Sequence, residues 1–523
     1  MAERVDVCVI GSGFGGSILA YYLAQAGQKV VVLERGPRIP TRELQLDLDP
    51  KQLLRMLTTF NGNGVIVLAG SVVGGGSIVY SGASLRAPSF VFERTQGGRR
   101  IWPQALSRGS LNRFYRRAER GLGVHQLDFD EVAKRGGVWA KRMNRLGLRV
   151  EPMRQATTRC VHCGFCNTGC KFHRKNHLTL NYLLGAERAG AEVRPDSEAT
   201  MVQPADGGYR VLYGPRDDSS LTRPSAPPAS EATEIQAARV VCAGGAMGTP
   251  GLLGRSRPYL PNLSDQVGRN LSGNGDLSLA AILPEDATLP GRGRVRQHQG
   301  VAMDTVCYEY LESNGFIIIT QHLLSNAVLL NDDGRGTGQW FGLSKKHAMR
   351  RYADRMLGLA VIGVDGSPGT IFPAADDQTS ITPAFGVGLI DYPIDPETDR
   401  LYADARRIVG GLVERMGGEF LDLTLNPAPG HPQTAFTAHP LGTARLADTP
   451  ELGVANADGE VFGHPGLYVA DGAAVPTSLG VNPSLTIAAI AERIARRLVR
   501  RLGGTPAPPP DPNPFKHERG GGG

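Results

Sequence analysis

The feature that most constrains this fold is a glycine-rich turn near the amino terminus. Gly11, Gly13 and Gly16 follow an apolar run that ends at Ile10, and a second apolar run ends at Glu34. Strand, glycine turn, helix and strand in this order form a βαβ unit that holds a dinucleotide pyrophosphate at the helix N-terminus. Glu34 stands where a carboxylate would bind ribose hydroxyls. The pattern predicts dinucleotide binding without choosing between FAD and NAD, and a purely structural turn is the alternative.

The chain is long enough for two intergrown domains around this unit. It has 523 residues, more than one hydrophobic core usually supports. A second apolar run at 238–245 stops at glycines, as another strand of the same sheet would. Alternating apolar runs within 290–430 predict a mostly antiparallel sheet that floors a substrate cavity. The Pro- and Gly-rich end from 503 to 523 is typical of a disordered tail.

Charge and hydropathy exclude several classes of protein. The 57 basic and 50 acidic residues give a net charge of +7, and basic pairs such as Arg99-Arg100 are dispersed. Dispersed charge favours a solvated surface over a nucleic-acid groove. Apolar runs such as 316–320 are far too short to span a bilayer. A core strand that begins at residue 5 leaves no signal peptide, so we expect a cytoplasmic protein with no nucleic-acid partner and no membrane span.

Four of the seven cysteines lie within eleven residues, at Cys160, Cys163, Cys166 and Cys170. This is the spacing of the bacterial ferredoxin run that binds an iron-sulfur cluster, although Lys171 replaces the usual proline. Structural zinc also takes four thiolates, but its two cysteine pairs are usually separated by a longer loop. Thiols without metal, or local disulfides, are the third alternative. The four cysteines are therefore candidate ligands of an iron-sulfur cluster.

Further segments carry a resemblance to a known family. In chain order they are 73–77, 241–250, 439–442, 468–472 and 482–487. With these segments the chain resembles the glucose-methanol-choline (GMC) flavoprotein oxidoreductases over most of residues 5–500. A Cys-rich segment stands ahead of the Asn-x-Leu sequence at Asn176 to Leu178. In this the chain is most similar to the cysteine-containing cholesterol-oxidase-like branch of the family.

The resemblance implies FAD as the cofactor and an α/β fold (α+β overall) with two domains. The first is a Rossmann-like FAD-binding domain built from the discontinuous segments 1–100, 185–285 and 432–502. The second is a substrate-binding domain with a mostly antiparallel sheet at 286–431. Residues 101–184 form an insertion or cap that carries the cysteines.

The same resemblance assigns the cofactor contacts. Residues 74–77 would line the flavin side of the pyrophosphate, and Asp471 and Gly472 would contact the ribityl chain or the pyrophosphate; ordinary glycine turns are the alternative. The expected cofactor-binding residues are Gly11, Gly13, Phe14, Gly15, Gly16, Glu34, Gly74, Gly75, Gly76, Ser77, Ala243, Gly244, Asp471, Gly472, Asn482 and Pro483.

Three residues are candidates for catalysis. Asn482-Pro483 precedes an amphipathic helix, where asparagine is equally a common N-cap. In similar enzymes the matching Asn and the His of the segment beginning at His439 face the flavin, so both would hydrogen-bond the substrate hydroxyl. A neutral imidazole can accept the hydroxyl proton as hydride leaves the carbon. Sterol-oxidising relatives also use a glutamate, for which Glu309 is the nearest match; a solvated strand carboxylate is its alternative.

These observations predict an FAD-dependent enzyme that oxidises an alcohol to a carbonyl. The expected substrate is a hydrophobic or sterol-like secondary alcohol, with dioxygen or a protein or quinone as the electron acceptor. One alternative is an iron-sulfur dehydrogenase for a sugar or natural-product alcohol. Another is a non-catalytic electron-transfer flavoprotein.

Overall fold

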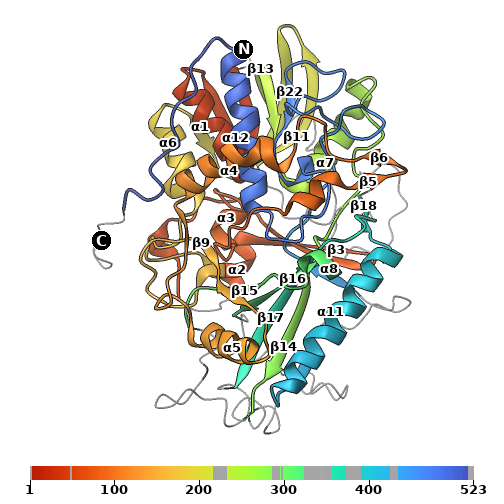
Figure 1. The fold of residues 1–523 in the computed structure, drawn as a ribbon. Coiled ribbons are helices and arrows are strands. Elements are labelled where there is room, and N and C mark those ends of the chain that lie inside the picture. Colours follow the sequence, from red (N-terminus) through yellow and green to blue (C-terminus); the bar gives the residue numbers. More distant parts are fainter. Residues whose placement is uncertain are drawn as a thin grey trace.

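The predicted βαβ unit lies at the centre of a mostly parallel sheet in the computed structural model (Figure 1). β1 (Glu3–Ile10) runs parallel to β2 (Val30–Leu33) on one side and to β13 (Thr233–Cys242) on the other. The structure describes residues 3–46, 50–215, 232–284, 295, 299–322, 343, 346, 355–371, 390–423 and 434–515. Within these ranges the Rossmann-like arrangement that the sequence predicts is confirmed.

Distant parts of the chain complete this first sheet of seven strands, six of which follow the order β10-β2-β1-β13-β12-β11, while the seventh, β22, pairs with β13 off this path. β10 (Glu192–Arg194) extends the parallel edge beyond β2, and β22 (Leu467–Val469) pairs in parallel with the end of β13. β12 (Gly208–Pro215) and β11 (Ser197–Ala205) add an antiparallel edge. The sheet is therefore assembled from discontinuous segments, as predicted.

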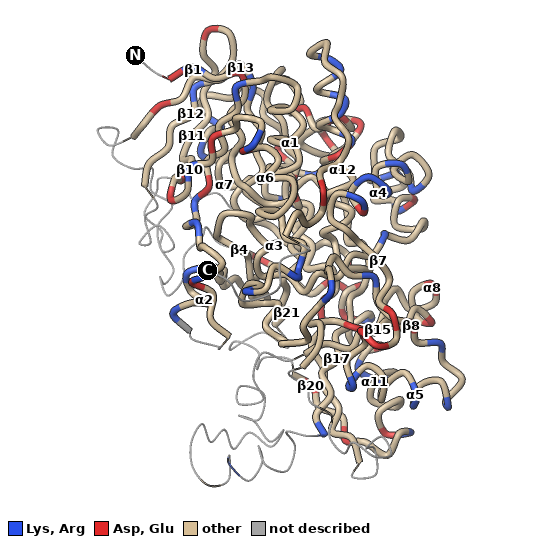
Figure 2. The backbone as a smooth tube through the Cα atoms, turned by 90° about the vertical axis from the view of Figure 1, so that its left-hand side faces the viewer, with Lys and Arg blue, Asp and Glu red and all other residues tan. Residues whose placement is uncertain are grey.

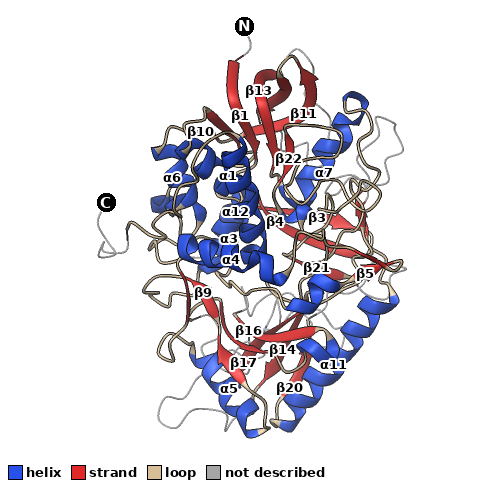
Figure 3. Cartoon of the chain, turned by 45° about the horizontal axis from the view of Figure 1, so that its top comes forward, coloured by secondary structure: helices blue, strands red, loops and turns tan. Residues whose placement is uncertain are grey.

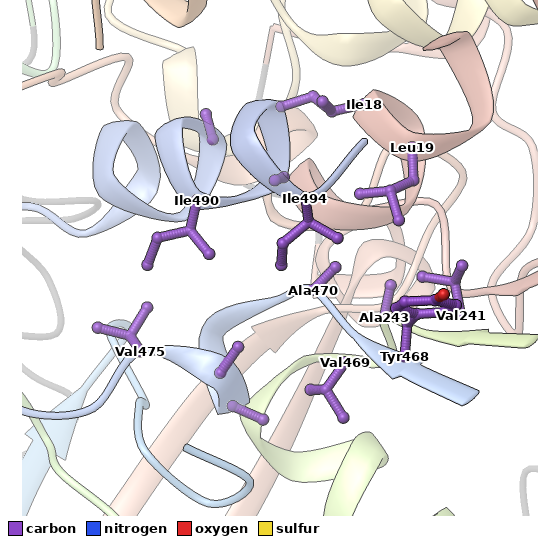
Figure 4. Close-up of a cluster of buried hydrophobic side chains, with 14 of the residues drawn as sticks. Ile18, Leu19, Val241, Ala243, Tyr468, Val469, Ala470, Val475, Ile490 and Ile494 are labelled. Carbon is purple, nitrogen blue, oxygen red and sulfur yellow. The ribbon is translucent and has the colours of Figure 1, made fainter. Parts of the chain in front are cut away.

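Helices cover both faces of the first sheet (Figure 3). α1 (Phe14–Gln25) packs against α12 (Ser484–Arg501) and α6 (Tyr182–Arg188), while α4 (Arg108–Leu122) packs on α12. α7 (Gly245–Ser256) follows β13 and contacts β11. Figure 4 shows Ile18 of α1 and Ile490 and Ile494 of α12 among the buried side chains above the sheet. Each such side chain stabilises the fold by about 1.5–3 kcal/mol through burial.

The second sheet is antiparallel throughout and has the order β20-β14-β17-β16-β15-β8. Its outer face is covered by α5 (Lys134–Arg145) and α11 (Pro396–Arg415). Asp395 caps the N-terminus of α11 by accepting a hydrogen bond from the Thr398 amide. The sheet matches the predicted fold, but two of its strands, β8 and β14, come from outside 286–431. The strand bounds are β20 (Glu419–Asp422), β14 (Leu277–Ile282), β17 (Met356–Gly363), β16 (Phe316–Gln321), β15 (Met303–Cys307) and β8 (Val150–Pro152).

A small third sheet lies between the two larger ones. It has the order β21-β4-β3, with β21 (Ala435–Thr437) parallel to β4 (Val65–Gly70) and β3 (Leu57–Gly62) antiparallel to it. The remaining short elements are α2 (Pro50–Met56), α3 (Gly76–Val79), α8 (Leu311–Asn314), β5 (Thr95–Gln96), β6 (Arg99–Arg100), β7 (Val124–Gln126), β9 (Arg154–Ala156), β18 (Thr370–Ile371) and β19 (Ile390–Asp391).

The end of the chain differs from the prediction of a disordered tail over residues 503–515. Asn513 is fully buried, and its side-chain amide donates hydrogen bonds to the His173 carbonyl at 2.7 Å and to Asn176 Oδ1 at 3.1 Å. The Tyr21 hydroxyl donates to the Pro508 carbonyl at 2.8 Å. An extended Pro-rich segment leaves its carbonyls free to accept such bonds, and these contacts hold it in place. Residues 516–523 lie outside the described part of the chain.

Basic and acidic residues are mixed along most of the backbone, with Lys and Arg grouped on α4 (Figure 2). Among the helices that the structure describes, none combines the length and the apolar character needed to cross a membrane.

Candidate active site

A cavity of about 990 Å³ lies where the three sheets meet. Most of the predicted site residues line it. The exceptions are Gly16, Gly74 and Ser77, which are next in sequence to lining residues, and Glu309, which lies elsewhere. The predicted residues that line it are Gly11, Gly13, Phe14, Gly15, Glu34, Gly75, Gly76, Ala243, Gly244, His439, Asp471, Gly472, Asn482 and Pro483. Segments more than 400 residues apart in the sequence therefore share one cavity.

The glycine turn is packed tightly on the protein side and open on the cavity side. A Cβ on Gly15 would lie 1.9 Å from the Ala470 carbonyl oxygen, and one on Gly11, whose φ is +99°, would lie 2.3 Å from that of Ala243. Among the described residues, a Cβ on Gly13 would meet no protein atom within 4 Å. Gly13 is the N-cap of α1, and no side chain in the described ranges caps that helix. Its free N–H groups and positive dipole end fit an anionic group such as a pyrophosphate.

Glu34 lies at the adjoining end of the cavity, at the end of β2. Its carboxylate accepts hydrogen bonds from the Ser12 amide at 2.9 Å, the Ser12 hydroxyl at 2.6 Å and the Gly36 amide at 2.8 Å. Burial raises its pKa. The Ser12 hydroxyl also accepts a hydrogen bond from the Gly74 amide, which joins the two glycine loops. An acid fixed beside an open glycine turn fits the adenosine and pyrophosphate part of FAD.

Asp471 joins two further segments of the cavity wall. Its Oδ2 accepts hydrogen bonds from the Gly245 amide at 2.7 Å and the Thr249 hydroxyl at 2.6 Å, and its Oδ1 accepts one from the Ala473 amide. Burial raises its pKa. These bonds fix the start of α7 against the chain that leads to α12. The Asp471 side chain thus shapes the wall for a cofactor through contacts within the protein.

His439 lies in the cavity wall just after β21, and a carboxylate orients its ring. His439 Nδ1 lies 2.8 Å from Asp276 Oδ1, and Asp276 Oδ2 accepts a hydrogen bond from the Thr437 hydroxyl at 2.8 Å. The His439 amide donates to the same hydroxyl. A carboxylate beside Nδ1 favours the tautomer that carries its proton there, so Nε2 keeps a lone pair for the cavity.

Asn482 has its amide beside that nitrogen. Its Nδ2 lies 3.4 Å from His439 Nε2 and 3.7 Å from the sulfur of Met303. Its Oδ1 is buried and has no hydrogen-bond partner among the described residues. The N-cap of α12 is Pro483, and among the described residues no side chain caps the helix. The N-cap interpretation of Asn482 is therefore wrong, and its Oδ1 is left without a hydrogen-bond partner in the described part of the chain.

Asn274 and Asp276 lie in one short turn and position Asn482 and His439. The Asn274 amide donates to the Val481 carbonyl at 2.8 Å, and Asn274 Oδ1 accepts from the Leu479 amide at 2.7 Å. This fixes the chain that ends at Asn482, while Asp276 fixes His439. The sequence interpretation missed Asp276 and Asn274. The only local signal is the Gly-Asn-Gly turn that ends in an acid just before β14.

The structure does not bring Glu309 to the cavity. It follows β15 on an exposed turn, where its carboxylate accepts a hydrogen bond from the Arg149 amide at 3.2 Å. β15 ends at Cys307, and the chain then turns into α8 at the outer end of the sheet. The solvated-carboxylate alternative therefore describes Glu309, and Asp276 is the carboxylate beside the histidine.

The four clustered cysteines do not fit a metal cluster in this structure. All four are free thiols, with Cys166 and Cys170 buried and Cys160 and Cys163 partly buried. Over the described ranges, no group of three or more His, Cys, Asp or Glu side chains is arranged to hold a metal ion. The predicted iron-sulfur ligand set is therefore not supported.

The cysteine segment, residues 160–175, instead forms hydrogen bonds with the part of the chain that lines the cavity. Lys175 is buried, and its ammonium group donates to the carbonyls of Ile78, Tyr80 and Cys166. The Asn167 amide donates to the Val79 carbonyl at 3.0 Å. Burial lowers the pKa of Lys175 to about 8. These hydrogen bonds hold α3 and Tyr80, at its C-terminal end, in place.

The fold and cavity define a flavin-type dinucleotide-binding oxidoreductase, and comparisons with known proteins identify its family. Residues 7–274 match the N-terminal domain of the GMC oxidoreductases, and residues 400–491 match their C-terminal domain. The chain belongs to the GMC oxidoreductase family and is a flavin-dependent oxidoreductase.

Curated proteins are similar to this chain over most of its length, and solved structures share its fold. A cholesterol oxidase of Mycobacterium tuberculosis is 29% identical over 99% of this chain and 94% of its own length. The long-chain-alcohol oxidase FAO4B of Arabidopsis thaliana is 27% identical over 95% of this chain and 68% of its own. The structure of a fungal aryl-alcohol oxidase superposes with a TM-score of 0.65 at 14% identity, covering 96% of this chain and 100% of that one. Pyridoxine 4-oxidase from Mesorbium loti gives a TM-score of 0.63 at 16% identity, covering 94% and 98%.

Proposed function

We propose that this enzyme oxidises the hydroxyl-bearing carbon of a hydrophobic alcohol to a carbonyl, with dioxygen as the final electron acceptor. The observation that carries the proposal is the pair His439 and Asn482 in the wall of the cavity that also contains the glycine turn. The pair offers one proton acceptor and one amide donor side by side. That is what a hydroxyl needs in order to be held and deprotonated.

The protein's own groups divide the work as follows. The substrate hydroxyl donates its proton to His439 Nε2 and accepts a hydrogen bond from the Asn482 amide. Asp276 keeps the proton of the resting imidazole on Nδ1 and stabilises the imidazolium that forms. The uncapped N-terminus of α12 lines the same cavity and stabilises negative charge that develops there. FAD, when bound, supplies the acceptor for the hydride.

In the overall reaction, the alcohol and dioxygen would give a carbonyl compound and hydrogen peroxide. The O–H bond gives its proton to His439, and bound FAD would take up the hydrogen and the electron pair of the C–H bond. Dioxygen would then take two electrons and two protons and leave as hydrogen peroxide.

Two observations support the choice of substrate and acceptor. Apolar side chains from all three sheets line the cavity, including Phe60, Leu68, Leu277 and Met303, which suits a hydrophobic substrate. The curated relatives are named cholesterol oxidase and long-chain-alcohol oxidase. A sterol-like secondary alcohol is therefore the first substrate to test, and a cytoplasmic location stays a prediction from the sequence.

The test is anaerobic reduction of the purified protein by a panel of alcohols, with flavin, iron and sulfide analysis. We expect a yellow protein without iron whose visible absorption is bleached by hydrophobic alcohols and returns with air as peroxide forms. Bleaching that only an artificial acceptor reverses would indicate a dehydrogenase, and bound iron and sulfide would favour the iron-sulfur alternative. A bound flavin that no alcohol bleaches would leave the electron-transfer flavoprotein.

A further inference from the structure

Tyr402 of α11 is buried in the cavity wall. Its side chain lines the cavity and is 2% exposed. Among the described residues, its hydroxyl has no hydrogen-bond partner. A buried polar group left unpaired costs about 1–3 kcal/mol. A donor kept in a cavity wall at such a cost is best explained by a ligand that accepts its hydrogen bond.

A second buried tyrosine nearby provides the contrast. The Tyr392 hydroxyl donates to Asp365 Oδ2 at 2.9 Å and accepts from the Gly273 amide at 3.2 Å. These bonds fully explain its burial by structure alone. Tyr402 is 2% exposed and Tyr392 is 1% exposed, so burial does not distinguish them. Of these two tyrosines, Tyr402 is the one whose hydroxyl lacks a partner among the described residues and whose side chain lines the cavity.

The surroundings of Tyr402 define what its hydroxyl can bind. Arg406 lies one turn later on α11 and also lines the cavity, but its Nε donates to Asp422 at 2.7 Å. Burial, followed by the negative charges of Asp365 and Asp276, raises the pKa of Tyr402. The phenol is therefore a neutral donor at physiological pH. Because the guanidinium charge is already matched by a carboxylate, the expected acceptor is a neutral oxygen.

Tyr402 comes from a different element than the pair that holds the reacting hydroxyl. It lies on the helix that covers the second sheet, whereas His439 and Asn482 lie beside the third sheet and at the start of α12. Leu277 and Ser278 of β14 also line the cavity and follow Asp276 directly. A molecule held by His439 at one point therefore has a second polar contact available toward the second sheet.

We propose that Tyr402 donates a hydrogen bond to a second oxygen of the substrate. The preferred substrate is then a hydrophobic alcohol that carries a second neutral oxygen, a hydroxyl or a ketone, on the part that reaches the second sheet. This inference rests on the proposed function and narrows it to a class of substrate.

The test uses the flavin-loaded enzyme and the variant Tyr402→Phe. The probes are straight-chain and polycyclic secondary alcohols, each with and without a second hydroxyl or ketone at successive positions. We expect wild-type enzyme to prefer one doubly oxygenated probe over its mono-alcohol by about tenfold in kcat/KM, the value of one hydrogen bond. Tyr402→Phe should abolish that preference and leave the mono-alcohol within about twofold.

Binding is measured separately with ketones that have no hydroxyl to oxidise. A diketone should raise the melting temperature of wild-type enzyme more than the matching monoketone does, and Tyr402→Phe should remove the difference. This readout needs no hydride transfer. Absence of bleaching by every alcohol would therefore count against the proposed function, whereas equal binding of the two ketones would count against the role of Tyr402.

Two control variants separate this role from a structural one. Tyr209 lies on β12 in the first sheet and is not one of the residues that line the cavity. Tyr209→Phe removes a hydroxyl that donates to the Pro465 carbonyl and should leave the substrate preference unchanged. Tyr392→Phe removes a paired hydroxyl and should lower the melting temperature, whereas Tyr402→Phe should keep or raise it. A second-oxygen preference that survives Tyr402→Phe, or no such preference in wild-type enzyme, would overturn the proposal.

Discussion

The two ends of the cavity are built in different ways. At the cofactor end, backbone atoms pack so closely that Gly11 and Gly15 have no room for a side chain, and the open space lies in front of Gly13. At the catalytic end, side chains hold one another, since Asp276 fixes His439 and Asn274 fixes the chain before Asn482. The cofactor end depends on glycines that have no side chain, whereas the catalytic end depends on a few specific side chains. Substitutions at the cofactor end should therefore impair folding or FAD binding, and those at the catalytic end should impair the reaction.

The largest effect is expected from Gly15→Ala, which breaks the packing of the cofactor end. Its Cβ would lie 1.9 Å from a backbone carbonyl oxygen, and backbone atoms cannot move aside as a flexible side chain can. We expect destabilisation by roughly 3 kcal/mol or more, measured as lost soluble yield and a lower melting temperature.

Gly13→Ala is the matched control, because its Cβ meets no protein atom within 4 Å and its φ of −68° suits alanine. This variant should fold with a melting temperature close to that of the wild-type apoprotein but bind FAD more weakly. Full flavin content in Gly13→Ala would show that the space in front of Gly13 does not belong to the cofactor.

His439→Ala tests the catalytic end in the opposite way. It should leave flavin content and thermal stability nearly unchanged while lowering kcat by about 10²–10⁴, the usual contribution of a general base. Anaerobic stopped-flow measurement of flavin bleaching reports this step directly. A variant that bleaches at the wild-type rate would remove His439 from the mechanism.

Asp276→Asn asks whether the histidine needs its carboxylate. The amide keeps the size of the side chain but no longer favours the proton on Nδ1 or stabilises an imidazolium, so we expect bleaching to slow by about 10². The exposed Asp265→Asn variant is the control for a change of one charge. If both variants react alike, Asp276 has only a structural role.

The smallest effect concerns the segment that braces the cofactor end. Burial lowers the pKa of His177 to about 3, whereas an exposed histidine has a pKa of about 6.5. Between about pH 6.5 and pH 3, His177 is therefore protonated in the unfolded chain but neutral in the folded chain. The free energy of unfolding falls as the pH falls through this range. The loss reaches about 2 kcal/mol by pH 5.

His177→Gln should remove this part of the acid sensitivity. Melting temperatures of the two proteins measured between pH 7.5 and pH 5 should converge as the pH falls. Curves that stay parallel over this range would show that His177 does not cause the loss.

The cofactor end could be predicted from the sequence because its signals are local. The glycine spacing, the apolar runs on either side and the acid at Glu34 all lie within one βαβ unit, where strand and helix periods decide the structure. The antiparallel sheet was also predictable from alternating runs. Its edges were not, because β8 and β14 join it from segments that local pattern assigns elsewhere.

The catalytic end was only partly predictable, because its key contact joins residues 163 positions apart. His439 and Asn482 came from a family resemblance, which did not extend to Asp276 in a glycine turn. The same limit explains Glu309, since a loose match along the chain gave no information about where β15 ends. The prediction of a disordered tail from composition was wrong for residues 503–515. There, Asn513 and its neighbours form hydrogen bonds with α1, α12 and the cysteine segment.

The short turn from Gly273 to Asp276 belongs to both halves of the molecule. Its Asp276 contacts His439, and the next residue, Leu277, begins β14 of the second sheet. Replacing the second sheet with that of another protein would therefore also change the carboxylate that orients the proton acceptor, His439. New specificities in this scaffold are more safely obtained by single side-chain changes on α11 and β14, and the same constraint would have acted on gene fusion and recombination during its evolution.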